Sequence, residues 1–217
     1  IPREKLLPWG IPVRQSFMKQ WNKKEARKIC HIPQNNKSYL VMGGSMGFGK
    51  IQIFVLELAR RMEADENMVV ICGNNKKLEK LLKRELVHRK NVKVLGYTDQ
   101  VAAYMAACDV IFTKPGGLSS TKAAMMRIPM VHTNPIPGCE TKNVEFFQKH
   151  GMSIGKRSFV GQVRTGEKLL EREKLRAQMQ EAQKKNSRPE AAERICKLLE
   201  ELTGNKENRI IDLEIIQ

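Results

Sequence analysis

From Leu40 onward the chain alternates between short apolar runs and longer segments in which apolar residues recur every three or four positions. Short apolar runs bounded by glycine or proline are typical of buried strands, and the longer periodicity is typical of amphipathic helices. Strands are predicted at Leu40 to Met42, Met68 to Cys72, Val92 to Gly96, Asp109 to Thr113 and Met130 to His132. Helices are predicted between and after them, at Ile51 to Met62, Lys76 to Leu86, Gln100 to Ala107, Ser119 to Met126 and Thr141 to His150. This alternation indicates an α/β fold, a doubly wound parallel sheet with flanking helices.

The segments outside this alternating region are rich in charge or proline. Four proline and glycine positions interrupt the first residues, and a basic helix is expected from about Ser16 to Cys30. Two charged helices are expected at about Gly166 to Lys185 and Pro189 to Leu202, before a tail of unassigned structure. We therefore divide the chain into an entry segment with a basic helix (1–33), an α/β domain (34–155) and C-terminal charged helices with the tail (156–217).

A glycine-rich turn, Gly43 to Gly49, separates the first strand from the first amphipathic helix. Strand, glycine turn and helix form a phosphate-binding arrangement, because glycine lets the backbone approach an anion and the helix N-terminus offers free N–H groups. The spacing matches neither the dinucleotide fingerprint nor a P-loop. Taken alone, the turn is also compatible with a tight connection that binds nothing.

Two further turns are expected at the same edge of the sheet, because they also follow strands. They span Lys114 to Ser120 and Asn134 to Glu140, and the helix after the first of them offers Ser119 and Ser120 as caps. Two helix N-termini directed at one crevice suit a diphosphate, and Glu140 is placed to accept hydrogen bonds from sugar hydroxyls. The sequence contains no Asp-x-Asp metal motif, so helix dipoles and cations are expected to neutralise the phosphates without a metal.

Charge and cysteine content narrow the possible partners. The net charge is +16, and residues 76–90 alone carry seven basic residues against two acidic ones. Such an excess attracts nucleic acid, anionic lipid headgroups or phosphorylated ligands. The five cysteines are scattered without a C-x-x-C pair, which favours a reducing compartment over a disulfide framework or a zinc site. The chain has no signal peptide and no apolar run long enough for a membrane span. Because its first residue is Ile1, not Met, we expect a piece of a longer protein.

Several motifs together resemble those of the monogalactosyldiacylglycerol synthase and processive diacylglycerol glucosyltransferase group. They are Gly10-Ile11-Pro12-Val13, Val41-Met42-Gly43-Gly44-Ser45-Met46-Gly47, Thr113-Lys114-Pro115-Gly116-Gly117 and Pro135-Ile136-Pro137-Gly138-Cys139-Glu140-Thr141-Lys142-Asn143. That group is similar to the N-acetylglucosaminyl transferase of peptidoglycan synthesis, within the GT-B fold. The match runs from about Gly10 to Gly155, with the motifs in the right order and spacing.

The resemblance implies the Rossmann-like C-terminal half of a GT-B glycosyltransferase, which binds a UDP-sugar and needs neither a cofactor nor a metal. Phosphate-binding residues would be Gly43, Gly44, Ser45, Gly47, Gly116, Gly117, Leu118, Ser119 and Ser120. Tyr97 and Thr98 would meet uracil, and Pro137, Gly138, Glu140 and Asn143 would contact the hexose. At the ribose position the family usually has a glutamate, where this chain has Lys122, a donor that cannot accept from the ribose hydroxyls.

The resemblance further implies an inverting transfer of a hexose to a lipid acceptor such as diacylglycerol. The acceptor site and the general base would lie in an N-terminal domain absent from this chain, so the catalytic residues are unknown and the fragment alone is expected to be inactive. The positive charge would fit peripheral docking on the cytoplasmic, inner face of an anionic membrane. Two alternatives stay open: a UDP-N-acetylglucosamine epimerase of the same fold, and a non-catalytic basic module that binds nucleic acid. We expect no nucleic acid, because aromatics make up only 6% and do not interleave with the lysines.

Overall fold

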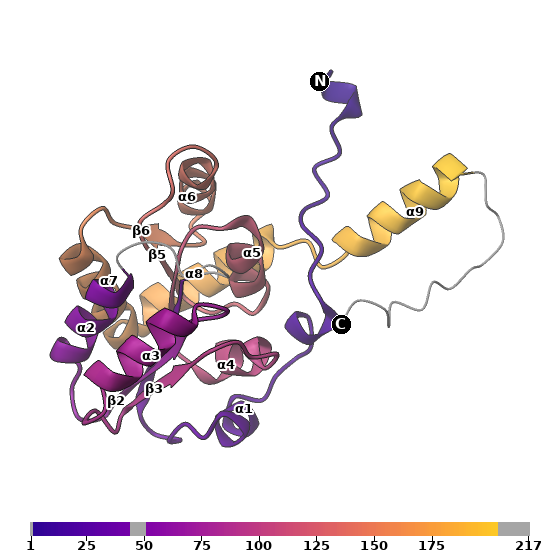
Figure 1. The fold of residues 1–217 in the computed structure, drawn as a ribbon. Helices are drawn as coiled ribbons and strands as arrows, with labels where there is room; N and C mark the ends of the chain where they lie inside the picture. The colour runs from indigo at the N-terminus through magenta and orange to yellow at the C-terminus, as the bar shows by residue number, and fades with distance from the viewer. Residues whose placement is uncertain (1, 44–50, 204–217) are drawn as a thin grey trace. The chain divides into compact units, whose positions relative to one another are not determined.

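The computed structural model describes residues 2–43 and 51–203, which contain a six-stranded parallel sheet (Figure 1). The strand order is β3-β2-β1-β4-β5-β6, and every neighbouring pair is parallel. The strands are β1 (Lys37–Met42), β2 (Glu66–Ile71), β3 (Val92–Leu95), β4 (Val110–Thr113), β5 (Met130–His132) and β6 (Ile154–Gly155). The predicted doubly wound parallel sheet is confirmed, with β6 as a two-residue edge strand that the sequence pattern did not predict.

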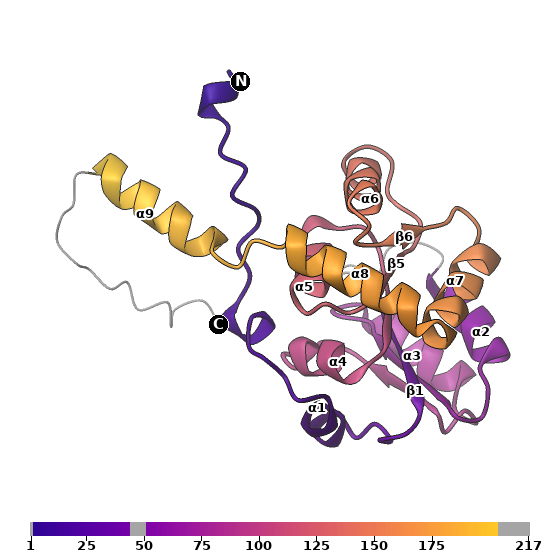
Figure 2. The same cartoon turned by 180° about the vertical axis from the view of Figure 1, so that it is seen from behind.

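Helices cover both faces of this sheet, so the central strands are buried on both sides (Figures 1 and 2). One face packs against α1 (Lys23–Cys30), α4 (Val101–Ala107), α5 (Gly117–Met125) and α6 (Cys139–Lys149). The other face packs against α2 (Ile51–Arg61), α3 (Lys76–Glu85) and α7 (Phe159–Glu171). In β1, Leu40 enters the first cluster while Tyr39 and Val41 enter the second. This two-sided burial explains why the strands are continuous apolar runs rather than alternating ones.

The compact α/β unit comprises Val13–Ser187, whereas the range predicted for the α/β domain was 34–155. Helix α1 packs on α4, and α7 packs on β4 and β5, while α8 (Glu173–Asn186) packs on α5 and α7. A second unit combines residues 2–12 with residues 188–203. It contains a short 3-10 helix, η1 (Arg3–Lys5), and α9 (Ala191–Thr203).

Two predicted helices differ from the structure for local reasons. The helix expected from Ser16 begins only at Lys23, after the short η2 (Gln15–Phe17), because the Asn22 side chain accepts from the N–H groups of Lys24 and Glu25 at 2.9 and 3.3 Å. A side-chain cap of this kind stabilises the first turn and so fixes the residue at which the helix begins. The helix expected from Gly166 to Lys185 is two helices, α7 and α8, which are separated by the extended residue Arg172.

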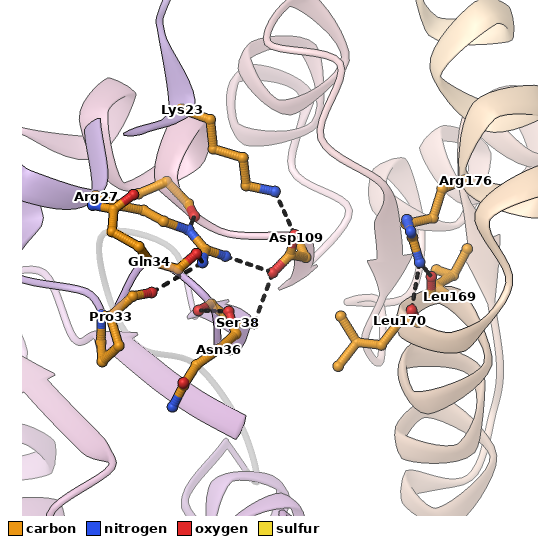
Figure 3. A network of polar contacts seen from close by, with 11 residues as sticks. Lys23, Arg27, Pro33, Gln34, Asn36, Ser38, Asp109, Leu169, Leu170 and Arg176 are labelled. Atoms are coloured by element: carbon orange, nitrogen blue, oxygen red, sulfur yellow. Dashed lines mark hydrogen bonds and ion pairs between the residues drawn. The ribbon is translucent and has the colours of Figure 1, made fainter. Parts of the chain in front are cut away.

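Buried Arg27 fixes α1 to the sheet (Figure 3). Its guanidinium donates to the carbonyl oxygen of Ala107 at 3.0 Å, to the carbonyl oxygens of Pro33 and Gln34, and to a carboxylate oxygen of Asp109 at 3.0 Å. The same carboxylate accepts from the N–H of Ser38 at 2.8 Å and forms an ion pair with Lys23. This network joins α1 to the end of α4 and to the starts of β1 and β4, at the edge of the sheet away from the predicted site.

Candidate functional site

The site lies where β1 and β4 end side by side. These two neighbours are paired in parallel, with Met42 opposite Thr113, and their following connections lead to opposite halves of the sheet. In open α/β sheets this switch point opens a crevice outside the carboxyl ends of the strands, where ligands bind. Gly43 follows β1 and the Lys114-Pro115-Gly116 turn follows β4, so Gly43 and this turn both lie at the carboxyl edge of the sheet.

A cavity of about 510 Å³ lies on one side of this switch point, over β2, β3 and the start of α5. Its lining includes seven residues predicted from the sequence: Tyr97, Thr98, Gly116, Gly117, Leu118, Ser119 and Lys122. Lys114, Gly73 and Asn74 also line it, together with apolar side chains from the strand ends. Tyr97, Thr98, Lys122 and four of the nine residues that the resemblance assigns to the phosphates are therefore neighbours around one space.

A second cavity, of about 320 Å³, lies on the other side, over β5 and α2. Its walls include the predicted residues Gly43, Pro137 and Glu140, together with Asn134 and the Phe159 ring. Three predicted phosphate-binding residues, Gly44, Ser45 and Gly47, lie outside the described residues. Lys114 lines both cavities and so stands at their junction.

Lys114 and Glu140 form an ion pair at that junction, with Nζ 2.8 Å from Oε1. The Glu140 side chain is only 7% exposed, and its other oxygen, Oε2, accepts from the N–H of Ile136 at 2.8 Å. A β-carbon added at Gly116 would lie 3.7 Å from Lys114 Cε and 3.9 Å from Glu140 Oε1, so the residue preceding α5 lies directly beside the pair. A cation, a carboxylate and a helix N-terminus therefore meet within one small region.

Two other predicted hexose contacts, Asn143 and Gly138, belong to the connections around α6. Asn143 Nδ2 donates to the carbonyl oxygen of Pro115 at 2.8 Å, which ties α6 to the turn before α5. Gly138 precedes α6 with φ of +101°, a conformation that side-chain-bearing residues rarely adopt. Neither residue lines either cavity.

The predicted capping role of Ser119 and Ser120 is wrong, because α5 already begins at Gly117 and is preceded by Gly116 without a side-chain cap. Ser120 is fully buried, and its Oγ lies 2.9 Å from Nε2 of His132. Ser153 Oγ lies 3.1 Å from the other ring nitrogen. Burial lowers the pKa of His132 to about 4, against the opposing effect of the Glu140 carboxylate. His132 is therefore a buried residue whose two ring nitrogens both have hydroxyl partners, and the Ser120 hydroxyl is directed at this histidine.

Lys122 is a half-buried cation in the wall of the larger cavity. Its Nζ lies 4.8 Å from the centre of the buried Phe17 ring. Burial lowers the pKa of this ammonium group, and the nearby positive charge of Arg14 lowers it further. Among the described residues that line this cavity, none carries a carboxylate. The larger cavity is therefore cationic where the resemblance places the ribose.

The sequence did not lead us to predict that Lys114, Asn74 and Asn134 line the two cavities. Lys114 lay within a recognised motif, but its ion pair joins residues 26 positions apart, which no local pattern predicts. Each asparagine follows a strand by a few residues, and this position at the carboxyl edge was the available signal. Within residues 2–43 and 51–203, no group of three or more His, Cys, Asp or Glu side chains is arranged to hold a metal ion.

Comparison with known proteins shows the family to which the chain belongs. The family model for glycosyl transferases group 1 matches residues 22–186. A processive diacylglycerol β-glucosyltransferase of Bacillus cereus is 30% identical over 199 residues, covering 90% of this chain and 50% of that protein. WaaG, a glycosyltransferase involved in lipopolysaccharide biosynthesis, superposes with a TM-score of 0.67 at 17% identity, over 87% of this chain and 54% of that one.

A second similar structure contains ligands. Anabaena HepE, solved in complex with UDP and glucose, superposes with a TM-score of 0.64 at 15% identity, over 88% of this chain and 55% of that one. At such identities the structural likeness concerns the fold. The chain spans between 38% and 54% of the length of the curated relatives to which it was compared.

Proposed function

Because the chain belongs to the group 1 glycosyl transferases and has the fold of a GT-B C-terminal domain, we propose that it is the UDP-sugar-binding half of an inverting glycosyltransferase. The observation that carries the proposal is the pair of cavities that meet at Lys114 beside the start of α5. The larger cavity has room for a nucleoside, and the smaller one has room for a hexose. The junction between them combines a cation with a helix N-terminus, which suits the diphosphate that joins these two parts.

The transferred group in this proposal is a hexose, and the acceptor is a lipid hydroxyl such as that of diacylglycerol. Support comes from the curated relatives named as processive diacylglycerol β-glucosyltransferases, at about 30% identity. In an inverting transfer the acceptor hydroxyl attacks the anomeric carbon from the face opposite the leaving UDP. The acceptor site and the general base are then expected in the part of the protein that this chain does not include, so the chain alone binds the donor and transfers nothing.

Location at a membrane surface is part of the same proposal. No helix within residues 2–43 and 51–203 is long and apolar enough to cross a bilayer. The exposed side of α3 and the following turn carry seven basic residues, which we call the α3 basic surface: Lys76, Lys77, Lys80, Lys83, Arg84, Arg89 and Lys90. This charge suits peripheral docking on the cytoplasmic, inner face of an anionic membrane, where the lipid acceptor would be found.

Calorimetric titration tests the donor assignment. We expect the chain to bind UDP, to bind ADP more weakly, and to bind uridine more weakly than UDP, because both the base and the diphosphate are recognised. An unrelated oligonucleotide is the control for binding that depends only on the charge of +16. Oligonucleotide binding with no response to UDP would favour a basic nucleic-acid module instead. Hexose transfer to diacylglycerol by this chain alone would contradict the proposed placement of the acceptor site.

A further inference from the structure

Lys114 connects the two cavities physically, and it is the only charged side chain among the described lining residues that both cavities share. Its side chain is 25% exposed, whereas the partner carboxylate of Glu140 is 7% exposed. Lysine carries its charge on a flexible four-carbon stem, so its Nζ can move between partners with little change in the backbone. The buried carboxylate is held more firmly, because its Oε2 also accepts from the N–H of Ile136.

Each carboxylate oxygen of Glu140 already accepts from one donor, Oε1 from Lys114 and Oε2 from a backbone N–H. Each oxygen has a second acceptor position, but the side chain is only 7% exposed, so a sugar hydroxyl and the Lys114 ammonium compete for the same small accessible part of the carboxylate. A diphosphate at the junction changes this balance, because it brings negative charge to Lys114 beside the N-terminus of α5. Moving Lys114 away would leave the buried Glu140 carboxylate without its counter-charge, which is costly in free energy. A sugar hydroxyl that donates to the carboxylate in place of Lys114 offsets this cost.

We propose that Lys114 exchanges partners when the donor binds, moving from Glu140 to the diphosphate and so freeing Glu140 Oε1 to accept from a hexose hydroxyl. This inference rests on the proposed function and adds the residue that couples its two cavities. The bond from Oε2 to the Ile136 N–H persists and keeps the carboxylate in position throughout. Binding of the diphosphate in one cavity thereby prepares recognition of the hexose in the other.

The exchange predicts opposite effects from the two members of one ion pair. Lys114→Met should weaken UDP binding by about tenfold or more, since a charge-assisted contact is lost, and should leave uridine binding nearly unchanged. Lys114→Arg keeps the charge and should retain most of the affinity. Glu140→Gln should bind UDP as tightly as the original chain or tighter, because the diphosphate no longer competes with a carboxylate for Lys114.

Glu140→Gln should also lose the advantage of a UDP-hexose over UDP, measured as the ratio of their dissociation constants. A merely structural ion pair would not separate these two ligands. Lys168→Met, at an exposed position of α7, removes one positive charge away from both cavities and controls for the general charge of the chain. Thermal unfolding and uridine binding verify that each variant is folded. If a single variant fails to fold, the double variant Lys114→Met/Glu140→Gln, which leaves no unpaired charge, is titrated in its place and should bind UDP weakly.

The outcomes distinguish this inference from the proposed function. If the original chain binds no UDP, the proposed function is wrong and the exchange falls with it. If the original chain binds UDP but Lys114→Met and Glu140→Gln weaken it equally, the donor assignment stands and the exchange is overturned. Weak UDP binding by Lys114→Met together with undiminished UDP binding by Glu140→Gln supports the exchange.

Discussion

Lys122 has an unusual environment for a lysine, because it is half-buried, lies over the Phe17 ring and has the positive Arg14 nearby. Contact with an aromatic face compensates part of the lost hydration of the ammonium group. Its pKa is lowered, because burial disfavours the charged form and the positive charge of Arg14 acts in the same direction. A carboxylate at this position would face Arg14 and would also be able to accept from a ribose.

We therefore predict that Lys122→Glu tightens UDP binding by about tenfold or more, because net values of about 1.5–3 kcal/mol attach to hydrogen bonds with charged groups. The gain should be much smaller for 2′,3′-dideoxyuridine diphosphate, which lacks both hydroxyls. Lys122→Gln is the matched control, since it removes the cation without adding a carboxylate. Calorimetry with both ligands on all three proteins is the measurement. Unchanged or weaker UDP binding by the glutamate variant would mean that Lys122 serves the phosphates or lies outside the nucleotide site.

At the scale of elements, the apolar pattern was a good guide to the central strands of the sheet and to α3. The predicted span of β5 is the observed one, and α3 begins at the predicted residue with Leu78 and Leu82 inward. The errors fall where a polar contact decides instead. Asn22 starts α1, and α7 begins at Phe159 because Ser158 accepts from the N–H of Gly161. Several neighbouring residues are polar enough to serve as the cap, so hydrophobic periodicity alone does not predict at which residue the helix begins.

Close packing of α7 on β4 depends on Gly166, which sequence reasoning had placed at a helix start. A β-carbon added at Gly166 would lie 2.2 Å from Cζ of Phe112, a fully buried ring. That ring has little room to move, because Phe54 packs edge-on against it with ring centres 4.9 Å apart. The glycine therefore sets the distance between this helix and the sheet.

Gly166→Ala should lower the free energy of unfolding by up to about 2 kcal/mol. Overpacking of a core typically costs about 1–3 kcal/mol, and the better helix propensity of alanine returns about 1 kcal/mol. Urea unfolding measures the change. Phe112→Leu makes room for the new methyl group, so the double variant should lose less than the sum of the two single variants. Strict additivity would show that the clash with Phe112 is not the cause.

For the whole molecule, the pattern of strands and helices predicted the sheet and the edge where the site lies, because turns after parallel strands gather at one edge. It did not predict the contacts across that edge. The pairs Lys114–Glu140 and Ser120–His132 come from separate strand-turn-helix units and depend on side-chain directions. Charge was similarly incomplete as a guide: Arg27 belongs to the basic N-terminal stretch but is buried in a structural network, whereas the α3 basic surface is exposed.

The α3 basic surface yields the last prediction, on membrane binding. Replacing Lys77, Lys80 and Arg84 by glutamine should weaken binding to anionic liposomes by about 100-fold, since each basic residue near such a surface contributes about 1 kcal/mol. Lys168, Lys174 and Lys184, exposed on α7 and α8, provide a control variant with the same loss of charge. Liposome co-sedimentation is the measurement, with zwitterionic vesicles and added salt as further conditions. Binding should vanish on the zwitterionic vesicles and fall steeply with salt, because exposed charges are screened over about 10 Å at 0.1 M ionic strength. Equal losses in the two triple variants would mean that the net charge of the chain acts without a defined docking surface.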